Sequence, residues 1–143
     1  VIFSCNHCPY VRAWEGRMVD LQRVYGARDV ALVAINPNDA ERYPDDSFDA
    51  MKQRAQDEGF NFRYLHDESQ EIARAYGAER TPHVYLLYSD GILRFRGAID
   101  DNYEDPDAVQ HTYLRDALDA VLAGDSPAVE TTPAVGCTIK WRA

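Results

Sequence analysis

The chain has 143 residues, 45% of them hydrophobic and 27% charged, which is enough apolar material for the core of one globular domain. Its formal net charge of −9 makes it a poor partner for the phosphates of nucleic acids. No apolar run approaches the ~18 residues that a membrane-spanning helix needs. Composition therefore argues against disorder, nucleic-acid binding and membrane insertion.

The first half of the chain predicts alternating strands and helices. Val1–Phe3 is β-prone and resembles the end of a buried strand, so we expect further elements ahead of it. Apolar side chains recur at steps of three and four over residues 9–25, which indicates an amphipathic helix. The apolar run at 30–35 is typical of a strand buried on both faces. Ser47 is a suitable N-cap for a helix that Gly59 ends.

The second half predicts another strand and helix, a hairpin and a closing helix. Residues 62–65 and 69–76 fit a short strand and a short helix. Apolar runs at 84–88 and 92–99 flank a Ser-Asp-Gly turn and indicate an antiparallel hairpin. Residues 106–123 fit a last amphipathic helix.

This order of elements predicts an α/β fold, a central mixed sheet flanked by helices. The hairpin is expected to add an antiparallel edge to parallel strands. We expect one domain over residues 1–124 and an irregular C-terminal tail, residues 125–143, that packs on it.

The negative charge is concentrated in two segments. Residues 39–49 contain five acidic residues and one arginine, and residues 100–107 contain five acidic residues and no basic one. These segments account for the whole net charge of −9. Runs of like charge are usually solvated, so we expect both segments to be exposed loops.

The most informative motif is Cys5-Asn6-His7-Cys8, at the junction between the first strand and the first helix. A helix N-terminus offers unpaired N–H groups and a partial positive charge, and both favour a thiolate. We therefore expect Cys5 to be an exposed nucleophile with a lowered pKa, and Cys8 to be a more shielded resolving thiol. Asn6 and His7, which lie between the two cysteines, are expected to tune the pKa.

Other roles fit these cysteines less well. Haem attachment needs a histidine directly after the second cysteine, where Pro9 stands. A structural zinc site needs four ligands, and the sequence has no second cysteine pair. A disulfide across so short a loop would constrain the unfolded chain little. The motif therefore favours redox chemistry.

Two features further along the chain bear on this interpretation. Thr81-Pro82 precedes the predicted hairpin, where local pattern alone favours a trans bond, since only ~5% of X-Pro bonds are cis. Cys137 lies far from the other cysteines. It fits a remote resolving thiol, a partner in mixed disulfides, or a small buried side chain, which is the default for a free cysteine.

Together these motifs resemble the thioredoxin-like superfamily, and more closely the bacterial redoxin proteins of the thiol-disulfide isomerase/thioredoxin, or AhpC/TSA-like, group. The stretches that carry the resemblance are Phe3–Val11, Ile35–Asp39, Tyr43–Asp46 and Gly136–Trp141. The resemblance implies a thioredoxin-like fold in which Pro82 is a cis proline facing the two cysteines. It also implies that Thr81 offers backbone groups to an extended substrate segment, and that a segment precedes Val1.

The sequence also departs from known members of the superfamily. Thioredoxin carries Trp-Cys-Gly-Pro-Cys, whereas this chain has Ser4 before the motif and an Asn-His pair within it. His7 is similar to the histidine of the periplasmic disulfide oxidases, which implies a more oxidising couple than thioredoxin's. Peroxiredoxins place a threonine three residues before their reactive cysteine, where this chain has Ile2. The resemblance thus supports disulfide exchange more than peroxidase activity.

We therefore predict a thiol–disulfide oxidoreductase in which Cys5 forms a mixed disulfide with substrate and Cys8 resolves it. No cofactor or metal is expected. The expected partners are a disulfide-containing protein or small-molecule thiol and an external reductase or oxidant, and the expected location is the cytoplasm. Two alternatives remain: an antioxidant thiol peroxidase that uses Cys5, and a module that binds copper through Cys5, Cys8 and a histidine.

Overall fold

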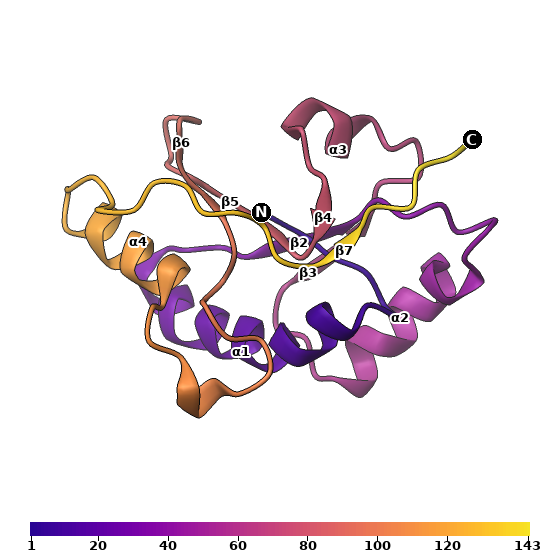
Figure 1. The fold of residues 1–143 in the computed structure, drawn as a ribbon, viewed down its shortest axis with the longest axis horizontal. Coiled ribbons are helices and arrows are strands. Elements are labelled where there is room, and N and C mark those ends of the chain that lie inside the picture. Colours follow the sequence, from indigo (N-terminus) through magenta and orange to yellow (C-terminus); the bar gives the residue numbers. More distant parts are fainter.

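The computed structural model describes residues 1–143 and consists of a twisted sheet with helices on both faces (Figure 1). The helices are α1 (Pro9–Tyr25), α2 (Phe48–Asp57), α3 (Glu71–Tyr76) and α4 (Tyr113–Leu122). The strands are β1 (Ile2–Phe3), β2 (Val33–Asn36), β3 (Arg63–His66), β4 (Arg80–Thr81), β5 (His83–Leu87), β6 (Leu93–Gly97) and β7 (Cys137–Thr138). None of the helices is long and apolar enough to cross a membrane.

The main sheet has the order β3-β2-β1-β5-β6. Strands β1, β2 and β3 are parallel, whereas β5 runs antiparallel to β1 and to β6. The mixed α/β fold and the antiparallel hairpin predicted from the sequence are therefore confirmed. A second, small sheet pairs β4 with β7 of the C-terminal tail.

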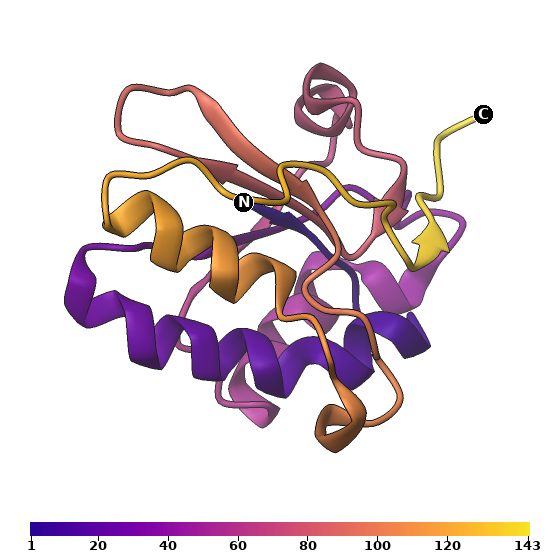
Figure 2. The same ribbon diagram turned by 60° about the vertical axis from the view of Figure 1, so that its left-hand side comes forward.

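Two apolar clusters hold the helices on opposite faces of the sheet. Successive residues of a strand point to opposite faces, and on β1 the side chain of Ile2 joins one cluster while Phe3 joins the other. The larger cluster is built around Trp14 and lies under α1 and α4, which run side by side (Figure 2). The smaller one includes Ala73 of α3 and Ile139 of the tail.

Helix α1 forms over the residues that the sequence predicts, and its start positions the motif. It begins at Pro9, where proline's missing N–H costs no helical hydrogen bond. Cys8 is therefore the N-cap residue, and Cys5 lies three residues earlier in the segment that follows β1. The positive end of the helix faces Cys8 rather than Cys5.

The strand predicted over residues 30–35 is shorter and shifted: β2 begins at Val33. The side chain of Gln22 accepts a hydrogen bond from the Leu32 amide at 2.6 Å and donates one to the Val30 carbonyl at 2.9 Å. Because a side chain of α1 supplies hydrogen-bond partners for these backbone groups, residues 30–32 need no neighbouring strand.

The helix predicted over residues 106–123 is wrong in its first half, because α4 begins only at Tyr113. In the residues before α4, acidic side chains accept hydrogen bonds from backbone amides that would otherwise bond within a helix. Asp105 accepts from the amide of Asp107 at 2.9 Å, and Asp101 accepts from the amide of Gln110 at 3.0 Å. Such local bonds favour turns over helix.

The expectation that both acidic segments are solvated is wrong at three residues: Asp39, Asp46 and Asp100 are buried. Asp100 is 5% exposed and accepts hydrogen bonds from the Trp14 indole at 2.9 Å and from the Arg17 guanidinium at 2.7 Å. The carboxylate thus ties the loop after β6 to α1.

Replacing Asp100 with alanine is expected to lower the free energy of unfolding by about 3 kcal/mol, because it leaves the Trp14 indole without its acceptor and a half-buried Arg17 without its counter-ion. Asp107→Ala is the matched control, since Asp107 is an exposed residue of the same loop. It should change stability by no more than about 0.5 kcal/mol. Urea denaturation measures both values, and equal losses would contradict the assignment.

Candidate active site

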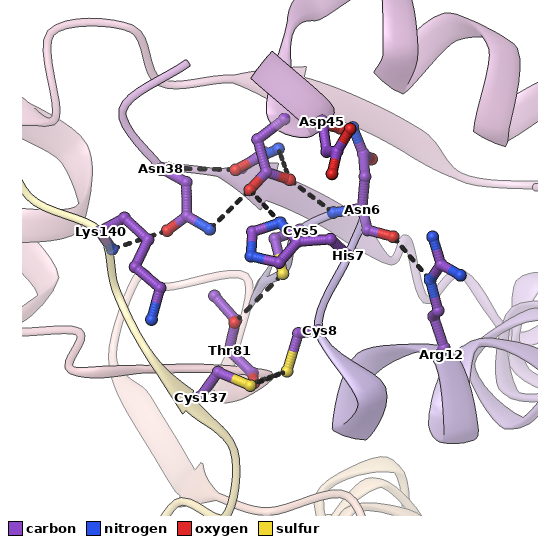
Figure 3. Close-up of polar contacts among 12 residues, drawn as sticks. Cys5, Asn6, His7, Cys8, Arg12, Asn38, Asp45, Thr81, Cys137 and Lys140 are labelled. Atoms are coloured by element: carbon purple, nitrogen blue, oxygen red, sulfur yellow. Dashed lines mark hydrogen bonds and ion pairs between the residues drawn. The ribbon is translucent and has the colours of Figure 1, made fainter. Parts of the chain in front are cut away.

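The two cysteines of the motif lie beside Thr81, the last residue of β4. The Thr81-Pro82 peptide bond is cis, as the resemblance implies. The Sγ of Cys5 lies 3.4 Å from the Thr81 hydroxyl, and the thiol of Cys8 donates to the Thr81 carbonyl at 3.3 Å (Figure 3). Cys5 and Cys8 therefore form one cluster around Thr81, although they lie 76 and 73 positions before it in the sequence.

The prediction that Cys5 is exposed is wrong in this structure, whereas Cys8 is shielded as predicted. Cys5 is 2% exposed and Cys8 0%. The C-terminal tail lies over the motif, and the Sγ of Cys137 is 2.6 Å from the Sγ of Cys8 (Figure 3). Cys137 is itself only half-buried, so the default expectation of a buried side chain is also wrong.

The prediction of a lowered pKa at Cys5 is likewise wrong. The hydrogen bond shared with Cys8, together with burial and the nearby Asp46 carboxylate, raises the pKa of Cys5. The pKa of Cys8 is lowered, mainly by the hydrogen bond from Cys5 and further by Cys137 and the backbone of Val11, although burial acts in the opposite direction. When this pair loses one proton, these shifts favour the thiolate at Cys8, at the N-terminus of α1, and Cys8 then no longer donates to the Thr81 carbonyl.

This charge distribution predicts how the reduced protein titrates. Cys8 should retain its thiolate below the usual pKa of a thiol, and Cys5→Ala should raise the pKa of Cys8 by removing the main hydrogen-bond donor. Burial and the neighbouring Cys8 raise the pKa of Cys137 to about 11, so it contributes no thiolate near neutral pH. The ultraviolet absorbance of the thiolate, followed against pH, measures this. A signal that survives in Cys8→Ser would contradict it.

A buried carboxylate that the sequence analysis missed positions the motif. Asp46 is 0% exposed and accepts hydrogen bonds from the backbone amide of Asn6 at 2.7 Å and from the side-chain amides of Asn36 and Asn38 at 3.2 and 2.9 Å. The Oδ2 atom, which accepts from Asn38, also lies 2.6 Å from the Nδ1 of His7. Asp46 thus fixes the loop that carries both cysteines.

The two residues between the cysteines have distinct surroundings. The side chain of Asn6 donates to the Asp45 carbonyl at 2.8 Å and accepts from the Tyr64 hydroxyl at 2.8 Å, so its polar atoms hold the loop in place. His7 pairs with Asp46, and one of its ring nitrogens, the Cys5 sulfur and an Asp46 oxygen lie within 4.8 Å of one another. His7 therefore lies near Cys5, and its influence on the pKa of Cys5 stays a prediction.

The copper site expected from Cys5, Cys8 and a histidine does not assemble in that form. The atoms that lie together are those of Cys5, His7 and Asp46, without Cys8. A carboxylate is a hard ligand, and both oxygens of Asp46 already accept N–H donors. This donor set is unsuited to a soft metal.

The fold and the paired cysteines beside a cis proline define a thioredoxin-like redoxin. The AhpC/TSA family model matches residues 1–96, about two thirds of the chain, and the chain belongs to that family. No functionally curated protein matches the chain.

Two solved structures are closely similar. An uncharacterized conserved protein from Geobacillus kaustophilus is 42% identical with a TM-score of 0.93, and the match covers 99% of this chain and 75% of that one. A hypothetical protein from Sinorhizobium meliloti 1021 is 35% identical with a TM-score of 0.93, covering 99% of this chain and 78% of that one. Neither description states an activity.

Proposed function

We propose that this chain is a thiol–disulfide oxidoreductase in which Cys5 and Cys8 form the redox couple. One observation carries the proposal: both sulfurs contact Thr81, directly before the cis Pro82, at the N-terminus of a helix. This geometry supplies a stabilised thiolate and a second thiol close enough to share its proton.

The opposite pKa directions of the two thiols favour an order of attack opposite to the one that the sequence suggests. The Cys8 thiolate attacks one sulfur of the substrate disulfide, and the other substrate sulfur leaves as a thiolate and takes up a proton. Cys5 then attacks Cys8, the Cys5–Cys8 disulfide forms, and the second substrate sulfur leaves. An external dithiol restores the reduced couple, or an external oxidant drives the reverse reaction. The substrate is a protein disulfide or a small-molecule disulfide.

Family membership also favours a second candidate, thiol peroxidase activity. That reaction needs a thiolate at the reactive cysteine, and the raised pKa of Cys5 argues against Cys5 in this role. The disulfide-exchange proposal therefore stands first.

Insulin reduction with dithiothreitol as electron donor, run in parallel with peroxide consumption, separates the two candidates. We expect the wild-type protein to accelerate insulin reduction and to consume peroxide no faster than free thiols do. Rapid peroxide consumption without insulin reduction would favour the peroxidase. Activity in neither assay would contradict a redox function.

A further inference from the structure

The C-terminal tail lies along the edge that a substrate segment would use. Strand β7 runs antiparallel to β4, with Cys137 opposite Thr81 and Thr138 opposite Arg80. The amide of Ile139 donates to the Glu79 carbonyl at 3.1 Å and extends this pairing. The backbone groups that were expected to receive a substrate therefore face the protein's own tail.

The tail is held in this position on both sides of Cys137. A Cβ atom added at Gly136 would lie 2.2 Å from the Thr81 carbonyl oxygen, so only glycine permits this approach. Beyond Cys137, Ile139 is buried, and the amide of Lys140 donates to the Asn38 side chain at 2.9 Å. These contacts place the Cys137 sulfur 2.6 Å from that of Cys8 (Figure 3).

We propose that Cys137 is a third redox-active thiol, held by β7 in the place of a substrate cysteine, and that it exchanges with the Cys5–Cys8 disulfide. Cys137 loses its proton and attacks the sulfur of Cys8, the Cys8–Cys137 bond forms and the Cys5–Cys8 bond breaks. Cys5 leaves as a thiolate and takes up the proton that Cys137 lost. The step moves a disulfide within the chain, with no net oxidation or reduction.

This inference rests on the proposed function and adds a second oxidised form to it. Cys8 is the sulfur common to both disulfides. In the Cys8–Cys137 form, a covalent bond holds the tail over the Thr81 edge and closes that edge to substrates. In the Cys5–Cys8 form, only hydrogen bonds and packing hold the tail there.

The full-length Cys5→Ser variant tests the exchange, because it retains only Cys8 and Cys137. The variant is incubated with oxidised glutathione, quenched with a thiol-blocking reagent and mapped by mass spectrometry. The Cys8 thiolate first forms a mixed disulfide with glutathione, and Cys137 then displaces reduced glutathione. We expect a Cys8–Cys137 disulfide without bound glutathione. A product that stops at the glutathione adduct of Cys8 would overturn the proposal.

Adding Gly136→Ala in the same background tests the role of the tail. We expect it to lower the yield of the Cys8–Cys137 disulfide about tenfold, because overpacking displaces the strand. Gly16→Ala is the matched control, since a Cβ at Gly16 meets nothing within 4 Å. Equal yields in the two variants would contradict a role for β7 in presenting Cys137.

Peptide mapping of the oxidised wild-type protein separates this inference from the proposed function and does not depend on how the variants fold. Both Cys5–Cys8 and Cys8–Cys137 disulfides are expected. A Cys5–Cys8 disulfide alone would overturn the role of Cys137 and leave the proposed function intact. If no internal disulfide forms, the proposed function itself fails.

Discussion

Cys8→Ser is expected to reduce disulfide exchange to the rate of the buffer alone. Cys8 carries the thiolate in the reduced protein, and it is the sulfur within reach of both Cys5 and Cys137. A serine hydroxyl at this position neither ionises near neutral pH nor forms a disulfide. Insulin reduction with dithiothreitol measures the loss, and retained activity would contradict the role of Cys8.

Trapping the mixed disulfide establishes which sulfur attacks the substrate. The double variant Cys5→Ser/Cys137→Ser removes both thiols that would resolve a disulfide at Cys8, so the substrate should accumulate covalently bound to Cys8. The matched variant Cys8→Ser/Cys137→Ser retains Cys5 alone and should accumulate less, since burial and the nearby Asp46 carboxylate still raise the pKa of Cys5 after Cys8 is removed. Accumulation on Cys5 instead would restore the order of attack expected from the sequence.

Asp46→Ala is expected to lower the free energy of unfolding by about 5 kcal/mol, because it removes a buried charge whose partners remain. The amides of Asn6, Asn36 and Asn38 would lose their acceptor, and the ring of His7 would lose the carboxylate beside it. The loop with both cysteines would also lose its main anchor, so disulfide exchange should fall in molecules that still fold. Urea denaturation and insulin reduction measure the two effects.

Asp45→Ala is the matched control for this prediction. Asp45 is adjacent and exposed, and it contacts the motif only through its backbone carbonyl, which alanine retains. It should change stability by no more than about 0.5 kcal/mol. Since a loss of 5 kcal/mol can unfold a domain of ordinary stability, Asp46→Asn provides the milder test. It keeps the shape but not the charge, and an unchanged titration of Cys5 in that variant would contradict the influence of Asp46.

The parts of the fold that the sequence predicts well are those with strong local patterns. The helix over residues 9–25 has a continuous apolar stripe, and the hairpin has two apolar runs around a turn; both are observed. The sequence pattern places the starts of α4 and β2 too early, because side chains form hydrogen bonds with the backbone ahead of both elements. Gln22 does so before β2, and Asp101 and Asp105 do so before α4.

The site could be located from the sequence but not assembled from it. The spacing of Cys5 and Cys8, and the cis bond implied at Pro82, pointed to one redox centre. The burial of Asp46, 40 positions from Asn6, and the contact between Cys8 and Cys137, 129 positions apart, depend on long-range packing. Only the Gly-Cys pair at 136–137 signalled a close backbone approach, since glycine is needed where no Cβ fits.

A redox titration of the wild-type protein in glutathione buffers, with thiols mapped at each potential, tests the central claim most directly. A stabilised Cys8 thiolate favours the reduced form, so we predict one two-electron transition at a potential above the ~−270 mV of thioredoxin. Cys8 should be oxidised in every molecule that has lost two thiols, with Cys5 as its main partner. Three cysteines that remain free thiols throughout, or oxidation that leaves Cys8 reduced, would contradict the account.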